Sequence, residues 1–421
     1  MDTPKYCFRS NNDIKPQKWI SVPFMSVIDK IIDFRGRTPK KLGYDWSKTK
    51  TDYLALSALN VKQGYIEKNL ESHYGTQELY NAWMKGNELK KGQILFTTEA
   101  PMGNVAQVPD EKPYILSQRT IAFNCSDIIS NDFLAHLLRS PNVQKDLAAL
   151  ATGGTAKGVS QKSLNKLFVS IPNSRIEQQK IADFLSSYDE KISIQRERVE
   201  ALERRKKGLL QKVFSQEIRF KADDGSEFSE WERKTVESCC LLIKDGTHGT
   251  HKDVINGIPL LSAKDIFENS VHIPSDSRKI SELDYKKIYA KYELKEGDVL
   301  ITIVGTLGRT AIIDSNTPRI AFQRSVAVMR PSTQLTTAKY LNYVCNSHEF
   351  QNEIEIRKKK GAQPGIYLGE LSSILIPVPS LPEQQKIADF FSAIDEQINV
   401  ERERLTTMEI IKKGLLQGLF C

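Results

Sequence analysis

The 421-residue chain has no long apolar run and only six cysteines, and these absences exclude several classes of protein. No stretch holds the roughly 20 apolar residues that cross a bilayer, and the start lacks the pattern of a secretory leader. The cysteines form neither a C-x-x-C pair nor a regular framework, which argues against a structural zinc and a disulfide scaffold. We therefore expect a soluble, cytoplasmic protein.

The sequence motifs of common catalytic sites are also missing. Residues 153–160, GGTAKGVS, resemble a phosphate-binding loop, but Val159 stands where that loop needs lysine. There is no G-x-G-x-x-G after a strand and no [ND]-P-P-[YF] element, so we expect neither S-adenosylmethionine binding nor adenine methylation by this chain. His248 and His251 lie in a turn-like segment where we predict no metal, and PDEK at 109–112 reads as a turn rather than a nuclease site. We predict no catalytic residue and no cofactor in this chain.

Charge gives a weaker indication. The formal net charge is +8, with a pI near 8.9. This moderate basic excess permits a polyanionic partner without requiring one.

An internal repeat is the most informative feature. Residues 177–214 recur at 383–420, offset by 206, with 23 of 38 positions identical. Fainter matches precede each copy, such as KKGQILFT with KEGDVLIT and ILSQRTIAF with IAFQRSVAV. The chain thus reads as domain, helix, domain, helix, with predicted bounds 1–173, 174–220, 221–379 and 380–421.

Each 38-residue copy is predicted to be one helix about 57 Å long. Apolar residues at spacings of three and four form one stripe, as in the seam of a coiled coil. We expect the two helices to pack antiparallel, with pseudo-two-fold symmetry, and to begin with capping boxes at Ser174/Glu177 and Ser380/Glu383. The stripe residues, predicted to form the spacer and partner surface, are Ile181, Phe184, Ile192, Val199, Leu202, Leu209, Ile387, Phe390, Ile398, Leu405 and Leu415.

Two pairs of polar residues interrupt this stripe at matching positions, Gln195 with Glu401 and Lys206 with Lys412. They either fix the register of the helices or mark frayed, partner-facing stretches. The sequence leaves both interpretations open.

The two domains are predicted to be α/β, each with a strongly curved, β-rich sheet. Short β-rich segments at 92–98, 112–123, 297–305 and 319–329 are broken by Gly, Pro and Asn. Helical segments at 132–150 and 338–360 follow them.

A duplicated domain with a fixed spacer suits a protein that binds two short DNA sequences separated by a gap. Features shared by both domains cannot explain the reading of two different sequences, so the Gln-Arg pairs at 118–119 and 323–324 should contact phosphate or brace the fold. Loops that differ are better candidates for base recognition, because Arg fits the edge of guanine while Lys serves equally on phosphate. The predicted DNA-binding residues are Arg35, Arg37, Lys40, Lys41, Gln118, Arg119, Thr155, Lys157, Lys244, His248, His251, Lys252, Gln323, Arg324, Lys358, Lys359, Lys360 and Gln363.

The repeated motif [LI]-P-x(0–3)-E-Q-Q-K-I-A-x-F-[LF], followed by a charged helix ending K-K-G-L-L-Q, resembles the specificity subunits of Type I restriction-modification systems. The resemblance covers essentially the whole chain. It implies a non-catalytic subunit with two target-recognition domains that read one split, asymmetric site in double-stranded DNA. It also implies that the helices dock two adenine-N6 methyltransferase subunits, and that restriction subunits join them; S-adenosylmethionine, ATP and Mg are expected on those partners.

Two alternatives remain at this point. A single-chain methyltransferase-nuclease would transfer methyl groups when given its cofactor. A coiled-coil adaptor that never touches DNA would lack the steep salt dependence of a phosphate-binding protein. The sequence does not distinguish a methylation-only system from one that also cleaves.

Overall fold

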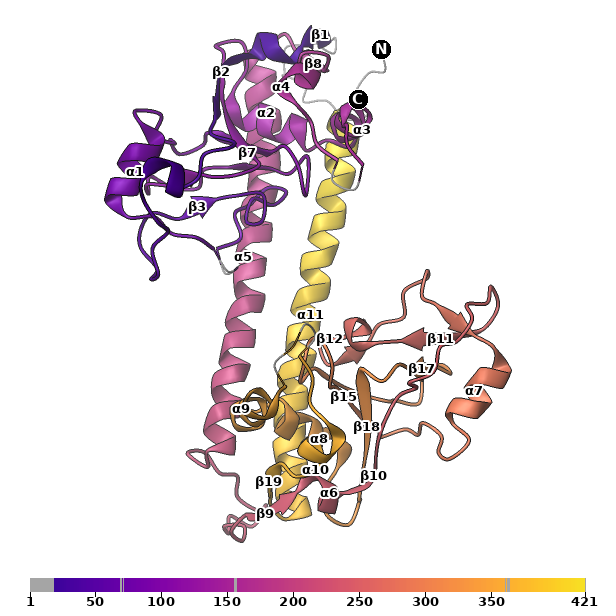
Figure 1. Ribbon diagram of the computed structural model, residues 1–421. Coiled ribbons are helices and arrows are strands. Elements are labelled where there is room, and N and C mark those ends of the chain that lie inside the picture. Colours follow the sequence, from indigo (N-terminus) through magenta and orange to yellow (C-terminus); the bar gives the residue numbers. More distant parts are fainter. Residues whose placement is uncertain are drawn as a thin grey trace, which may run out of the picture. The chain divides into compact units, whose positions relative to one another are not determined.

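The computed structural model describes residues 19–68, 70, 72–154, 157–359, 361 and 364–420 (Figure 1). The chain forms two compact units. Unit 1 extends to Glu197 and includes the C-terminal segment from Arg402, whereas unit 2 runs from Arg198 to Glu401. Each unit therefore contains one β-rich domain and a part of each long helix.

Unit 1 is built on a four-stranded antiparallel sheet in the order β2-β7-β4-β5. An antiparallel pair, β1-β8, and a parallel pair, β3-β6, accompany this sheet. The strands are β1 (Trp19–Pro23), β2 (Ile28–Asp33), β3 (Ala55–Leu56), β4 (Ile94–Thr97), β5 (Val105–Gln107), β6 (Ile115–Leu116), β7 (Thr120–Cys125) and β8 (Phe168–Pro172). The shorter helices are η1 (Phe24–Val27), η2 (Lys40–Leu42), α1 (Gln77–Met84), α2 (Asn131–Leu138), α3 (Pro141–Leu150) and α4 (Gln161–Leu164). Strand β4 is buried along its whole length, which explains its uninterrupted apolar run ILF.

Unit 2 repeats this plan with the sheet β10-β18-β15-β16, the pairs β9-β19 and β12-β13, and a three-stranded sheet β14-β11-β17. Its strands are β9 (Glu232–Thr235), β10 (Cys240–Asp245), β11 (Ile258–Leu261), β12 (Ile266–Phe267), β13 (Ser270–Val271), β14 (Lys279–Ile280), β15 (Val299–Thr302), β16 (Thr310–Ile312), β17 (Ala321–Phe322), β18 (Val326–Pro331) and β19 (Leu375–Val378). Its shorter helices are α6 (Val236–Cys239), η3 (Ala263–Asp265), α7 (Glu282–Ile288), α8 (Ala338–Cys345), α9 (His348–Arg357) and α10 (Leu368–Ser372).

The two units thus share one topology, as the repeat predicts. The first strand of each main sheet carries a bulge, between Ile28 and Lys30 in β2 and between Cys240 and Leu242 in β10. Bulges bend a strand and increase its twist. The predicted helical segments at 132–150 and 338–360 each form two helices, since Pro141 starts a second helix in unit 1 and the side chain of Ser347 caps one in unit 2.

The predicted long helices are confirmed as α5 (Arg175–Phe214) and α11 (Leu381–Leu419). Within each unit the two helices run antiparallel, because residues further along α5 pair with residues earlier in α11. In unit 1, Asp189 bonds Lys412 and Arg196 bonds Glu409 at 2.8 Å. In unit 2, Arg198 bonds Glu401 at 2.9 Å and Lys206 bonds Asp395.

These pairs concern three of the four polar stripe positions and favour the register interpretation there. Lys206 and Lys412 each bond an aspartate on the opposite helix, at equivalent positions of the repeat. Glu401 is 3% exposed and pairs with Arg198. The polar residues therefore contribute to the register of the helices.

The apolar stripe is mostly buried. Five of its residues are 6% exposed or less: Ile181, Ile192, Val199, Ile387 and Ile398. Five more are half-buried: Phe184, Leu202, Leu209, Leu405 and Leu415. Phe390 differs: it is 37% exposed and contacts Phe220 edge-to-face, while the fully buried ring is the next one, Phe391. Helical drift from the strict seven-residue repeat accounts for this one-residue change.

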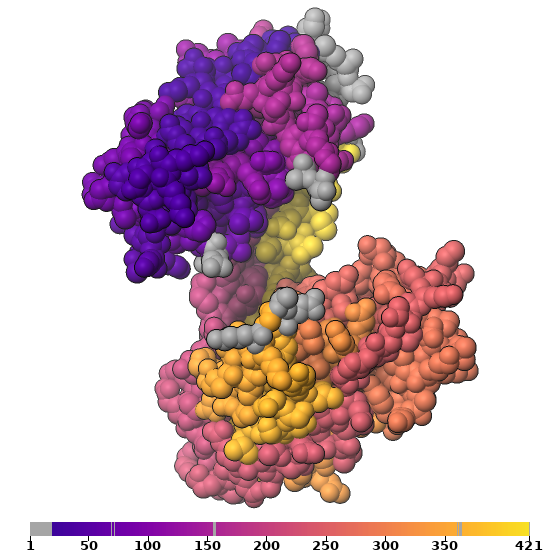
Figure 2. All heavy atoms as spheres, viewed as in Figure 1, coloured from indigo at the N-terminus to yellow at the C-terminus, as the bar shows by residue number. Residues whose placement is uncertain are grey.

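The C-terminal end of α5 lies in the core of unit 2, and that of α11 lies in the core of unit 1. Leu210, Val213 and Phe214 belong to the core of unit 2. The corresponding residues Leu416, Leu419 and Phe420 belong to the core of unit 1, where the yellow end of α11 meets unit 1 in Figure 2. Each unit therefore requires residues from the helix of the other repeat.

The predicted capping box at Ser174 and Glu177 keeps only its first half, and the one at Ser380 and Glu383 keeps neither half. The Ser174 hydroxyl does accept from the backbone N–H of Glu177 at 3.4 Å, but the hydroxyl of Ser380 has no hydrogen-bond partner among the described residues. The carboxylates do not reach back to the caps. Glu383, fully buried, accepts from Trp231 at 2.9 Å and from Arg219 at 3.0 Å, and the side chain of Glu177 bonds Trp19. In each case a tryptophan N–H that is distant in sequence donates to the carboxylate in place of the backbone N–H of the cap.

The described residues contain no helix long and apolar enough to cross a membrane. They also contain no group of three or more His, Cys, Asp or Glu side chains able to hold a metal ion.

Candidate nucleic-acid interface

In unit 1 the candidate loops meet at the turn that follows β4. The backbone N–H of Thr98 donates to the carbonyl of Arg119 at 2.8 Å, and the N–H of Val159 donates to the carbonyl of Thr98 at 2.9 Å. Glu99 forms a β-bridge with Gly158. The Gln118-Arg119 turn and the loop that contains Lys157 therefore lie on opposite sides of residues 98–99.

Arg119 is exposed and has a φ of +63°, a left-handed conformation that is uncommon for a residue other than glycine. Its Nε atom lies 3.7 Å from Glu99, a weak, half-exposed ion pair. Strained backbone of this kind persists where surrounding structure holds it, and it is frequent at functional sites. Arg119 thus presents a cation from a fixed turn.

The loop after β2 is anchored by Asp33. This carboxylate accepts from the Nε of Arg35 at 2.9 Å and from the Gln161 amide at 2.9 Å. Burial opposes ionisation of Asp33, but the bonds from Arg35 outweigh it and lower the pKa of the carboxyl. Arg35 is held in this way, whereas Lys40 is exposed and Lys41 donates to the carbonyl of Gly36 at 2.8 Å.

Arg37 differs from the other predicted residues of this loop. Its guanidinium donates to the carbonyl of Trp83 and lies 4.1 Å above the ring of Phe34. These contacts turn Arg37 toward the domain and give it a bracing role in the loop.

In unit 2 the loop after β10 packs directly on the Gln323-Arg324 turn. The N–H of Thr247 donates to the carbonyl of Phe322 at 2.8 Å, and that of Arg324 donates to the carbonyl of Thr247 at 3.0 Å. A Cβ on Gly246 would lie 2.1 Å from the Phe322 carbonyl oxygen, so only glycine permits this approach. Lys244, near the end of β10, and Lys252, on the loop, are both exposed.

The two histidines of the loop have different environments. His248 is 63% exposed and bonds Asp245 at 2.5 Å. The side chain of His251 is 11% exposed, bonds the Thr247 hydroxyl at 2.8 Å and lies 3.6 Å from Asp284. His248 is therefore accessible to a ligand, and His251 holds the loop together.

The second loop of unit 2, which contains Lys359, lies against the turn that follows β15. The N–H of Lys359 donates to the carbonyl of Gly365 at 2.8 Å, and that of Gly305 donates to the carbonyl of Pro364 at 2.8 Å. The ammonium of Lys359 lies 3.8 Å from the ring of Tyr367, and Lys358 pairs with Glu355. Thr155, Lys360 and Gln363 lie outside the described residues.

Each unit thus places its Gln-Arg turn close to two loops that differ in sequence between the units. The sequence identified these segments but not the residues that join them. Glu99 beside Arg119 and Tyr367 under Lys359 were missed, because neither belongs to a pattern that repeats in both domains. The repeat did contain a signal for one overlooked group: the Glu-Gln pair opening each long helix.

That pair fastens each long helix to its domain. The Gln178 amide donates to the carbonyls of Ile128 and Pro172, both at 3.1 Å. The Gln384 amide donates to the carbonyls of Leu335 at 2.8 Å and Pro379 at 2.9 Å. The identity of the two repeats at these positions therefore has a structural reason.

Comparison with known proteins agrees with this organisation. The family model of the Type I restriction modification DNA specificity domain matches residues 16–204 and 229–409. The chain belongs to this family. It is a specificity subunit, the DNA-recognising and non-catalytic component of a Type I system.

Several relatives match over most of their length. The Type I restriction enzyme MjaVIII specificity subunit of Methanocaldococcus jannaschii is 25% identical over 328 residues, which is 75% of this chain and 76% of that protein. The putative MjaX specificity subunit of the same organism is 24% identical over 96% of this chain and 93% of its own. The crystal structure of a Type I S subunit from M. genitalium shares the fold, with a TM-score of 0.53 at 17% identity over 100% of this chain and 99% of that one.

Proposed function

We propose that this specificity subunit recognises a bipartite, asymmetric site in double-stranded DNA. The observation that carries the proposal is the shared Gln-Arg turn, flanked in each unit by two loops that differ in sequence. Shared exposed cations suit phosphate, which is the same at every site, whereas differing side chains suit base edges. Two units with one topology and different loops would read two different half-sites.

The roles of individual residues follow from their exposure. Arg119 and Arg324 are exposed at equivalent turns and are proposed to contact phosphate. Arg35, Lys157 and His248 stand on loops whose sequences differ between the two units and are proposed to face bases. The remaining predicted cations are proposed to add to the electrostatic attraction of DNA.

The long helices are proposed to set the gap between the half-sites and to dock the partner subunits. Each helix starts in one unit and ends in the core of the other, so its length couples the two units. The partners proposed are two adenine-N6 methyltransferase subunits and ATP-dependent restriction subunits, which would supply S-adenosylmethionine, ATP and Mg. These assemblies act on chromosomal DNA, and we propose a cytoplasmic location.

A genome-wide map of N6-methyladenine, with and without this gene, tests the proposal. Loss of one split motif on deletion is the expected result and supplies the target sequence. An unchanged map in a host that expresses all subunits would contradict it. Replacing residues 221–379 with the second domain of another family member should change one half of the motif only.

The spacer role has its own experiment. Inserting one heptad into both α5 and α11 adds about 10 Å, or about three base pairs of B-DNA, to the helices. We expect a longer gap in the methylated motif or loss of methylation. An unchanged gap would refute the role of the helices as spacer.

A further inference from the structure

Unit 1 contains a cavity of about 570 Å³ that is separate from the loops described above. Its walls come from residues 62–65, the start of α3, the first half of α5 and the last turns of α11. Small-molecule sites in proteins commonly have volumes of about 300–1,000 Å³. The cavity is thus of a size that accommodates a metabolite.

The lining of this cavity carries surplus positive charge. Two carboxylates, Asp189 and Glu409, face five cationic side chains: Lys62, Arg139, Arg196, Lys412 and Lys413. Asp189 serves two of them, bonding Arg139 at 2.8 Å and also Lys412, and Glu409 pairs with Arg196 at 2.8 Å. Within the part of the chain that the structure describes, Lys62 and Lys413 form no ion pair.

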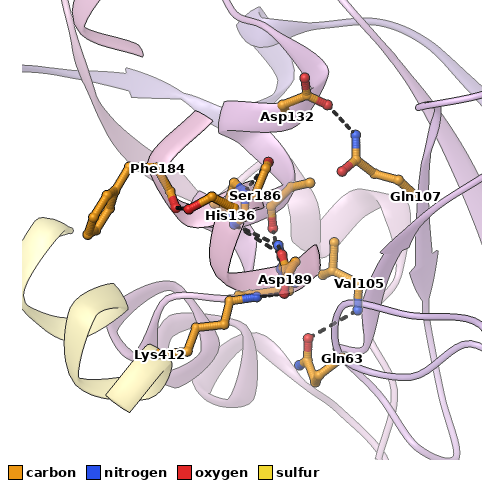
Figure 3. A network of polar contacts seen from close by, with 12 residues as sticks. Gln63, Val105, Gln107, Asp132, His136, Phe184, Ser186, Asp189 and Lys412 are labelled. Carbon is orange, nitrogen blue, oxygen red and sulfur yellow. Dashed lines mark hydrogen bonds and ion pairs between the residues drawn. The ribbon is translucent and has the colours of Figure 1, made fainter. Parts of the chain in front are cut away.

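Solvent screens the positive charge least at the two buried side chains of the cavity. The side chains of Arg139 and Lys412 are 6% and 9% exposed, and Figure 3 shows Lys412 pointing at Asp189 beside His136. Burial and the nearby Arg139 guanidinium lower the pKa of Lys412, and burial also lowers the pKa of Arg139 to about 10. A Cβ on Gly64 would lie 2.3 Å from an Arg139 nitrogen, so glycine leaves room for this guanidinium.

Unit 2 provides a natural comparison because the same frame lacks the second buried cation. Gln144 and Gln351 make equivalent bonds, to Gly103 and Gly308 at 2.9 Å, and fix the alignment of the two units. Five residues before Gln351 stands Asn346, where unit 1 has Arg139, and its amide bonds Thr310 at 2.7 Å. Asp395 of unit 2 faces Lys206 and the Tyr343 hydroxyl. The buried Arg139 guanidinium is therefore particular to unit 1.

We propose that this cavity binds a small, multiply charged phosphate compound, such as pyrophosphate or a nucleoside diphosphate. A planar guanidinium and several ammonium groups suit phosphate oxygens. One bound anion would offset the charges of Lys62, Lys413 and Arg139 and would favour the charged form of Lys412. The site is independent of DNA recognition, since none of the proposed DNA-binding residues lines it.

Titration calorimetry of the full chain with pyrophosphate and with ADP, in about 0.15 M salt, tests this proposal. We expect saturable binding at one site. Lys62→Gln and Lys413→Gln should each weaken binding about tenfold, the loss of one charge-assisted bond. Lys207→Gln is the matched control, because Lys207 occupies the position of Lys413 in the first repeat and is exposed. We expect it to leave binding unchanged.

Three results would overturn the proposal. The first is an absence of saturable binding of either probe to a chain shown by circular dichroism to be folded. The second is a loss of binding in Lys207→Gln as large as that in Lys413→Gln, which would indicate general surface charge. The third is full displacement of pyrophosphate by a DNA duplex of unrelated sequence, which would place the anion on the DNA interface. Each of these results would remove the proposed anion site and leave the proposed DNA recognition unaffected, so the two proposals fail separately.

Discussion

Replacing Phe420 near the C-terminus with alanine should destabilise the N-terminal domain. Phe420 is 2% exposed in the core of unit 1. Its ring packs against Phe133 at a centroid distance of 5.5 Å and against Trp19 at 6.2 Å, both near edge-to-face. Truncation of a buried phenylalanine typically costs about 3–5 kcal/mol. Since domains are stable by only about 5–15 kcal/mol, unit 1 should lose a large part of its stability.

Phe214→Ala is the matched control. Phe214 is 3% exposed in the core of unit 2 and packs against Tyr340 at 5.9 Å and Trp231 at 6.4 Å. We expect a similar cost, confined to unit 2. The two variants remove the same ring from the same position of the repeat and should act on different units.

Hydrogen exchange measured by mass spectrometry separates these effects, because peptides report on each unit. Phe420→Ala should accelerate exchange in the buried strands β4 and β7 and leave β15 and β18 protected. Phe214→Ala should do the reverse. If Phe420→Ala loosened β15 and β18 instead, or if neither set of strands changed, the assignment of helix ends to cores would be refuted.

Three further predictions concern single side chains. Arg119→Ala and Arg324→Ala should each weaken DNA binding for every sequence and reduce the salt slope by about one, as measured by fluorescence anisotropy; a loss restricted to the cognate site would contradict a phosphate contact. Burial, with the charges of Arg139 and Lys412, holds the pKa of His136 well below 6.5. Below about pH 6.5 the unfolded chain therefore takes up a proton at this histidine that the folded chain does not. The free energy of unfolding should then fall with pH by up to about 1.4 kcal/mol per pH unit. Urea midpoints at two pH values should show this loss in the wild type and a smaller one in His136→Asn. Glu383→Gln should cost about 1–3 kcal/mol in urea unfolding, because it removes the fully buried carboxylate that pairs with Arg219 and accepts from Trp231, whereas Glu177→Gln, which breaks no ion pair among the described residues, should cost less.

The sequence predicted the parts of the fold that depend on local order. The stripe that begins at Ile181 and Ile387 predicted both long helices to within a few residues of their observed ends. The strands with uninterrupted apolar runs, such as β4 and β15, were also expected, because burial on both faces leaves little choice of side chain.

The errors arose where a distant residue takes the place of a local partner. The capping boxes fail because Trp19 and Trp231, far from the caps in sequence, donate to the glutamates that would complete them. The predicted stripe did not include Phe214 or Phe420, since nothing in a helical pattern distinguishes a helix seam from the core of another domain. The approach of the candidate loops to the shared turns likewise depends on tertiary bonds.

The burial of each helix end in the opposite unit has a consequence for how such proteins diversify. The apolar residues that unit 2 borrows, Leu210, Val213 and Phe214, lie outside residues 221–379. A recombination event that replaces only residues 221–379 would leave these three apolar residues in place, and the incoming domain could pack its core against them. New pairs of half-sites could then arise by exchange of whole domains, because the similar helix ends would complete the core of either domain while the loops vary.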